Sequence, residues 1–80
     1  MAAVVVLYKA EGCHLCERAR AKLMELRDEL EFELEEVDIG LDPELEARYR
    51  ESIPVVEING QPAFTYYVQP EPFRRKLAGL

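Results

Sequence analysis

The sequence contains no apolar stretch long enough to cross a membrane. Its longest apolar run lies near the start, in MAAVVVLYKA, and covers only a handful of residues, whereas a transmembrane helix needs about 20. The same segment has no basic residues ahead of its apolar part, as a secretory signal peptide would have. We therefore expect a cytoplasmic protein with no membrane partner.

Positive charge is also scarce. Ten Lys and Arg residues stand against sixteen Asp and Glu residues, which gives a net charge of −6. Nucleic acids and anionic membrane surfaces bind basic faces, so neither is an expected partner. A chain of 80 residues is long enough for one domain only. We expect a single domain over residues 1–80 that acts as a monomer.

Cysteine is the third scarce residue, because Cys13 and Cys16 are the only two in the chain. A disulfide between them closes too short a loop to constrain the unfolded chain appreciably. Thiols in the cytoplasm are kept reduced, and a cysteine pair there is more often catalytic or metal-binding than structural. The pair therefore indicates chemistry rather than a structural crosslink.

Apolar periodicity and turn residues predict seven elements in the order β-α-β-α-β-β-α. The expected strands are Ala3–Tyr8, Phe32–Ile39, Val55–Ile58 and Ala63–Val68, and the expected helices run from His14 to about Asp28–Glu31, from Pro43 to about Glu51, and from Pro70 onward. Asn59-Gly60, between the last two strands, is a strong hairpin signal.

Two details of this pattern concern the strands. The apolar phase changes along the second strand, which predicts a bulge or a bend around Glu35–Glu36. Side chains alternate between the two faces of a strand, so one of Tyr66 and Tyr67 is expected in the core and the other on the surface.

The cysteine pair lies where the first strand is followed by the first helix. Cys13 stands at the helix start and Cys16 one turn further on, so the two sulfurs can meet. Unpaired N–H groups and the positive end of the helix dipole favour a thiolate at Cys13. Cys13 is thus the expected nucleophile and Cys16 the resolving thiol. His14, when protonated, would stabilise the thiolate further; otherwise it is a solvated residue.

Two other interpretations of the pair stay open. The cysteines could be inert core residues. A zinc site needs about four ligands, and one chain offers only two cysteines and His14. We therefore expect no metal ligand within a single chain, although two chains could share zinc or an iron–sulfur cluster. A binding module, or a dimeric carrier of a metal or cluster, is the alternative to an enzyme.

These features together resemble the thioredoxin fold in its short, glutaredoxin-like form. The residues that carry the resemblance are LYKAEGCHLC (Leu7–Cys16), VDI (Val37–Ile39) and SIPVVEING (Ser52–Gly60). The resemblance implies an α/β fold with a four-stranded mixed sheet flanked by helices, and a thiol–disulfide oxidoreductase that acts on protein or small-molecule disulfides. It also implies that Pro54 is cis and that the backbone of Ile53 pairs with the incoming substrate.

The sequence departs from the glutaredoxin pattern at the glutathione-binding positions. Glutaredoxins carry a Gly-Gly pair and an acidic residue after the last strand, where this chain has Tyr66-Tyr67-Val68-Gln69-Pro70-Glu71. They also tend to have a basic residue three before the first cysteine; that position is Ala10 here, and Lys9 is the nearest base. We therefore expect no bound cofactor and only poor use of glutathione. The reductant is glutathione or a thioredoxin-reductase-type system, and Lys9, His14, Ile53 and Pro54 are the candidate substrate-binding residues.

Overall fold

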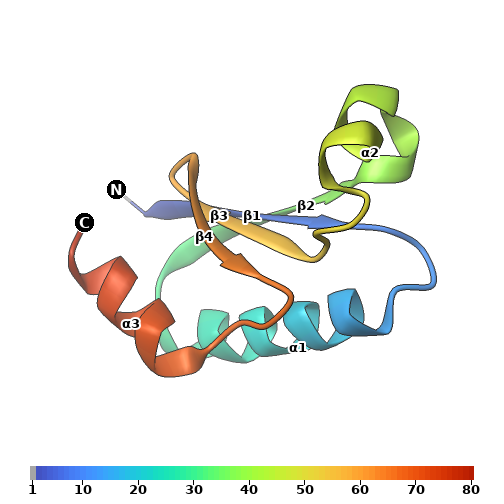
Figure 1. Ribbon diagram of the computed structural model, residues 1–80. Helices are drawn as coiled ribbons and strands as arrows, with labels where there is room; N and C mark the ends of the chain where they lie inside the picture. Colours follow the sequence, from blue (N-terminus) through green and yellow to red (C-terminus); the bar gives the residue numbers. More distant parts are fainter. Residues whose placement is uncertain (1) are drawn as a thin grey trace.

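The computed structural model describes residues 2–80, which form a four-stranded sheet and three α-helices (Figure 1). The strands are β1 (Ala3–Lys9), β2 (Phe32–Asp38), β3 (Val55–Ile58) and β4 (Gln61–Thr65), and the helices are α1 (His14–Glu29), α2 (Pro43–Tyr49) and α3 (Pro70–Ala78). The strand order is β2-β1-β3-β4. The β1–β2 pair is parallel and the other two pairs are antiparallel, so the expected mixed sheet and element order are confirmed.

The core lies between the sheet and the helices α1 and α3, which cover the same face (Figure 1). Val5 and Leu7 of β1 alternate toward this face and are fully buried, as period-two strand geometry requires. They pack in one cluster with Leu23 of α1 and with Phe73 of α3. Because both helices share one hydrophobic cluster with β1, the start of α1 is held at a fixed place beside the end of that strand.

Strand β2 runs beside β1 without a break in register, from Ala3 opposite Phe32 to Lys9 opposite Asp38. The predicted bulge around Glu35–Glu36 is therefore wrong. The phase change in the sequence arises because Glu36, which alternates with Phe32 and Leu34, is an exposed, ion-paired residue: Lys9 Nζ and Arg20 Nε each lie 2.8 Å from Glu36 Oε1. A carboxylate is tolerated on this strand face because it is paired with two cations and stays accessible to solvent.

The hairpin between β3 and β4 turns at Asn59 and Gly60, as predicted, and both have positive φ (49° and 79°). The β4 strand, however, ends at Thr65 and not at Val68, because the next residue, Tyr66, has a left-handed φ of 68°. The expected alternation of Tyr66 and Tyr67 between core and surface is therefore wrong. Both tyrosines are exposed, at 42% and 63%.

Helix α2 lies on the opposite face of the sheet from α1 and α3 (Figure 1). It ends at Tyr49, slightly earlier than predicted, and contains no fully buried residue. Its attachment is aromatic: the ring of Tyr49 stacks on that of Tyr8 with centroids 4.6 Å apart. Within residues 2–80, no helix combines the length and apolar character that a membrane crossing requires.

Candidate functional site

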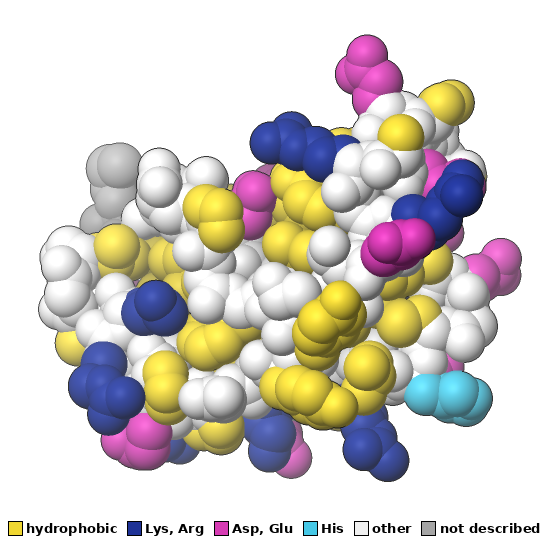
Figure 2. All heavy atoms as spheres, viewed as in Figure 1, with side chains coloured by type: hydrophobic (Ala, Val, Ile, Leu, Met, Phe, Trp, Pro, Cys, Tyr) yellow, Lys and Arg dark blue, Asp and Glu magenta, His cyan; other side chains and the backbone are white. Residues whose placement is uncertain are grey.

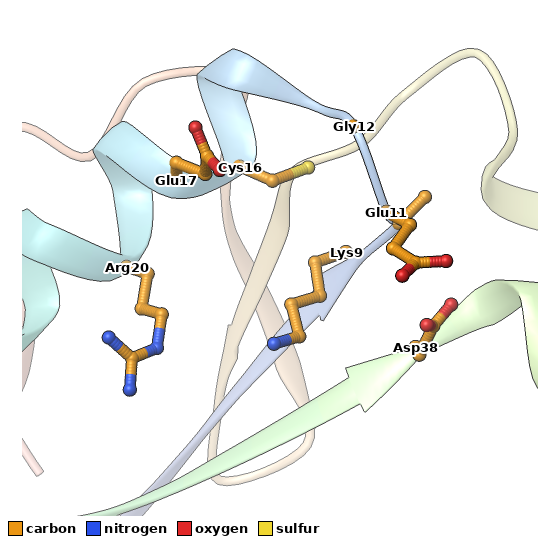
Figure 3. A pocket seen from close by; sticks show the side chains of 8 residues that line it. Lys9, Glu11, Gly12, Cys16, Glu17, Arg20 and Asp38 are labelled. Atoms are coloured by element: carbon orange, nitrogen blue, oxygen red, sulfur yellow. The ribbon is translucent and has the colours of Figure 1, made fainter.

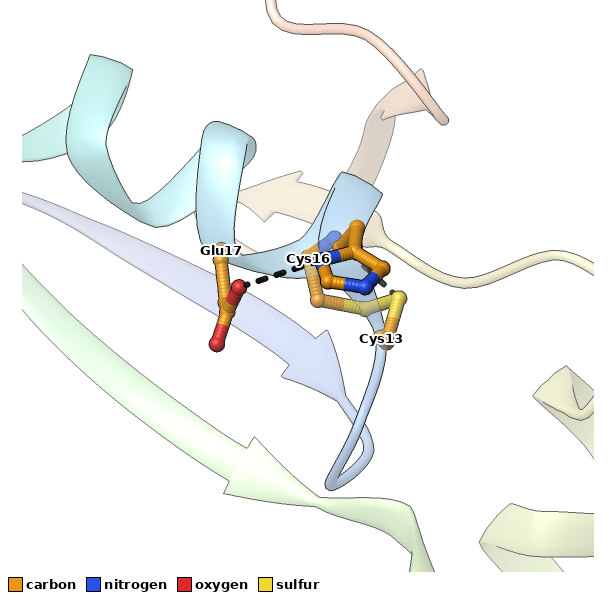
Figure 4. The surroundings of a disulfide bond; sticks show 4 residues. Cys13, Cys16 and Glu17 are labelled. Carbon is orange, nitrogen blue, oxygen red and sulfur yellow. Dashed lines mark hydrogen bonds and ion pairs between the residues drawn. A yellow bond between two sulfur atoms is a disulfide. The ribbon is translucent and has the colours of Figure 1, made fainter.

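The connection from β1 to α1 brings the two cysteines together. Gly12 has a φ of 74°, a conformation that favours glycine and lets the chain turn sharply into the helix. Cys13 is the N-cap residue of α1, and the N–H of Cys16 donates to Cys13 Sγ over 3.1 Å. The two residues form a disulfide, with their Cα atoms 5.2 Å apart (Figure 4).

The two sulfurs have different surroundings. Cys13 is only partly buried, whereas Cys16 is 2% exposed and belongs to the buried side of α1. Cys13 also occupies the end of the helix, where free N–H groups and the helix dipole stabilise a negative sulfur. An incoming group therefore meets the sulfur of Cys13 first. The buried sulfur of Cys16 is in contact with Cys13 and not with solvent.

The loop before β3 lies at the same end of the sheet as the cysteines, where β1 ends and β3 begins. In the antiparallel β1–β3 pair, Val55 stands opposite Tyr8, so Ile53 and Pro54 flank the chain that leads from β1 to Cys13. The Ile53–Pro54 peptide bond is cis, as the resemblance implied. Pro54 is fully buried, and Ile53 is half-buried with its N–H donating to the carbonyl of Tyr49 over 3.2 Å.

A small cavity of about 190 Å³ opens beside Cys16, along the connection from β1 to α1 (Figure 3). Five of the eight residues that line it are charged, namely Lys9, Glu11, Glu17, Arg20 and Asp38, and Cys16 is another of them. Lys9 is bonded to Glu36, and this hydrogen bond is the main cause that lowers the pKa of Glu36, assisted by Arg20 and opposed by burial. Lys9 therefore lines a cavity next to the buried sulfur of Cys16, and its own charge is already compensated by Glu36.

Sequence reasoning did not include Arg20 and Glu36 in this region. Arg20 follows Cys16 by four residues and so shares its helix face; Glu36 follows Leu34 by two and so shares its strand face. These two spacings in the sequence could have identified Arg20 and Glu36 as neighbours of the site. The contact between the two required knowledge of how α1 crosses β2.

His14 lies in the first turn of α1 and is almost fully exposed, with 95% of its side chain accessible. Its Nδ1 atom is 3.6 Å from Oε2 of Glu17, one turn further along the helix. The contacts of His14 are therefore with Glu17, and its role at the thiolate stays a prediction.

Comparison with known proteins gives a family match. Residues 4–78 match the family model described as Glutaredoxin-like domain (DUF836). No curated protein matches the sequence of this chain.

Comparison with solved structures identifies two chains of similar sequence and structure, and a thioredoxin that shares the fold. The solution structure of protein Ne2328 from Nitrosomonas europaea is 29% identical, with a TM-score of 0.83 over 96% of this chain and 93% of that one. The X-ray structure of protein XcR50 from X. campestris is 25% identical, with a TM-score of 0.77 over 95% and 97% of the two chains. Fasciola hepatica thioredoxin, at 22% identity and a TM-score of 0.64 over 98% and 80%, shares the fold.

Proposed function

The chain belongs to the glutaredoxin-like domain family, and we propose that it is a thiol–disulfide oxidoreductase acting through Cys13 and Cys16. The observation that supports this most is the unequal setting of the two sulfurs. Cys13 caps α1 and is partly exposed, while Cys16 is 2% exposed. This arrangement suits a nucleophile followed by a resolving thiol.

The proposed reaction starts from the reduced protein. The Cys13 thiolate attacks one sulfur of a substrate disulfide; the substrate S–S bond breaks, and its other sulfur leaves as a thiolate that takes up a proton. A mixed disulfide now joins Cys13 to the substrate. Cys16 loses its proton and attacks Cys13 Sγ, which releases the second substrate thiol and forms the Cys13–Cys16 disulfide. Two electrons have then passed from the protein to the substrate.

The oxidised protein must regain two electrons from a thiol reductant. We propose protein or small-molecule disulfides as substrates and a dithiol protein of the thioredoxin-reductase type as reductant. Glutathione is the weaker candidate, because the Gly-Gly-acid signature is replaced by Tyr66, Tyr67 and the residues after them. Ile53, Pro54, Lys9 and His14 remain the proposed substrate contacts.

Trapping the mixed disulfide tests this function. The reduced Cys16→Ser variant, mixed with a peptide that contains a disulfide, should accumulate a covalent adduct on Cys13 that mass spectrometry detects without reduction. The Cys13→Ser variant serves as the matched control and should form none. An adduct on Cys16, or none in either variant, contradicts the assignment.

The alternative of a metal or cluster carrier has its own test. The freshly purified, reduced protein is assayed for zinc and iron, and its absorption spectrum is recorded. Stoichiometric metal, lost in the Cys13→Ser variant, would favour a carrier over an oxidoreductase.

A further inference from the structure

The connection between β4 and α3 contains a tyrosine in an unusual backbone conformation. Tyr66 has a φ of 68°, a value that bulky residues rarely adopt and that persists only where the surroundings hold it. Two hydrogen bonds hold it here: its N–H donates to the carbonyl of Pro54 over 2.8 Å, and its hydroxyl donates to the carbonyl of Glu51 over 2.7 Å. The ring of Tyr66 is thus fixed beside the proposed substrate loop.

The same connection places apolar surface in solvent. Tyr66 and Tyr67 are 42% and 63% exposed, and Figure 2 shows hydrophobic side chains gathered on this face near the single histidine. A shallow cavity of about 150 Å³ lies there, lined by Arg18, Ala19, Lys22, Tyr66, Tyr67 and Val68. Exposed aromatic side chains next to one another are typical of surfaces that bind proteins.

The charge of this surface differs from that of the whole molecule. The chain carries a net charge of −6, yet the charged residues that line this cavity are Arg18 and Lys22. Lys22 is paired with Glu25 at 3.1 Å, while no ion pair of Arg18 occurs within residues 2–80. An uncompensated guanidinium beside two aromatic rings favours a ligand that is both acidic and apolar.

The position of this surface connects it to the cysteines. Tyr66 is hydrogen-bonded to Pro54, whose loop flanks the chain that leads to Cys13, and Arg18 lines the same cavity as Tyr66. A polypeptide whose disulfide reaches Cys13 would therefore extend its neighbouring residues over the tyrosines and past Arg18.

We propose that Tyr66, Tyr67 and Arg18 bind the segment next to the disulfide of a protein substrate, and that they select segments with an apolar residue and acidic residues near the cysteine. This inference rests on the proposed oxidoreductase function and adds the substrate class. Arg18 is the specificity-determining residue, and the two tyrosines form the apolar floor.

Two synthetic peptides test the proposal. Each carries one cysteine in a mixed disulfide with coloured thionitrobenzoate and a phenylalanine beside it; one peptide has three Glu residues around the cysteine and the other three Lys residues. The reduced full chain is mixed with each, and release of the coloured thiol gives kcat/KM. Chromophore release from either peptide tests the proposed function, whereas the ratio of the two rates tests the substrate class. The ratio cancels any general change in the reactivity of Cys13.

We expect the wild-type chain to prefer the acidic peptide, and Arg18→Glu to lower that preference by about fivefold or more. The matched control is Arg27→Glu, which makes the same charge change at an exposed position in the last turn of α1 and should retain the preference. Tyr67→Ala should raise KM for both peptides at an unchanged ratio. Added salt should weaken the wild-type preference.

Equal rates for the two peptides in the wild-type chain, or a preference that Arg18→Glu and Arg27→Glu reduce alike, would overturn the proposal. A second result would also overturn it: a glutathione mixed disulfide that is reduced faster than either peptide, at a rate that Arg18→Glu lowers to the same extent. The surface would then bind glutathione. Failure of both peptides to react at all would instead count against the oxidoreductase function.

Discussion

At the scale of single residues, the position of Cys13 at the N-cap of α1 determines what its sulfur can do. The N–H of Cys16 already points at Cys13 Sγ, and the helix dipole acts in the same direction. In the reduced protein, these groups should lower the pKa of the Cys13 thiol below the ~8.5 of a free cysteine. A lower pKa gives more thiolate at neutral pH and so a faster first attack.

The rate of alkylation by iodoacetamide as a function of pH measures this pKa. The Cys16→Ser variant isolates Cys13 and retains the backbone N–H at position 16, and the Cys13→Ser variant isolates Cys16 as the comparison. We expect the Cys13 rate to rise at lower pH than that of a free cysteine, and the Cys16 rate to stay low because its sulfur is buried. A Cys13 profile that matches free cysteine would contradict the assignment of the nucleophile.

At the scale of elements, α3 is held by one buried ring. Phe73 is fully buried and lies against Phe32 of β2 and Phe64 of β4, with ring centroids 5.3 and 6.1 Å away. Its half-buried neighbour Arg74 bonds to the exposed carboxylates of Glu29, at the end of α1, and Glu71. Exposed ion pairs contribute little to stability, whereas removal of a buried ring leaves a cavity.

Phe73→Ala should therefore lower the free energy of unfolding by about 3–5 kcal/mol, a large share of the ~5–15 kcal/mol that a small domain has. Arg74→Gln, one position away, is the matched comparison and should have a far smaller effect. Urea denaturation followed by circular dichroism measures both. Equal losses in the two variants would mean that the ion pairs, and not the ring, attach α3.

The sequence predicted those elements whose signals are local. The apolar run of β1, the helical periodicity of α1 and Asn59-Gly60 each determine their own structure, and the CxxC spacing at the start of a helix was enough to single out the candidate site. The end of β4 was not predictable, because Tyr66 carries no local signal for a positive φ; hydrogen bonds to the distant Pro54 and Glu51 hold it. The ion-paired position of Glu36 was missed for the same reason, since its partners Lys9 and Arg20 come from β1 and α1.

At the scale of the whole molecule, ion pairs between elements make stability depend on pH. Lys9, together with Arg20, holds the pKa of Glu36 below its ordinary value of 4.5, and Arg74 does the same for Glu29. A carboxylate whose pKa is lower in the folded state stabilises the fold above its unfolded pKa, and that contribution is lost as the pH falls through the folded pKa. The protein should therefore lose stability in acid, below about pH 4.5.

Melting temperatures measured from neutral pH down to about pH 3 check this expectation. Glu36→Gln should melt lower than the wild type at neutral pH, and the gap should narrow as the pH falls, because the wild-type carboxylate is then protonated as well. Glu33→Gln, on an exposed position of the same strand, is the control and should leave the wild-type curve nearly unchanged. A gap between Glu36→Gln and the wild type that stays constant with pH would rule out this role of the ion pair.

Strand β2 is an edge strand of the sheet, because β1 is its only neighbouring strand among residues 2–80. Such an edge offers unpaired backbone groups to any other extended chain, and proteins often protect it with charge. Glu33 and Glu35 are exposed there. Two copies that paired through their β2 edges would bring these acids together and repel each other.

Replacing Glu33 and Glu35 with threonine should therefore increase light scattering on storage. The double variant Glu31→Thr with Glu51→Thr makes the same charge change outside the strands and should not. The acidic residues of β2 would then also protect the folded protein from strand-by-strand aggregation.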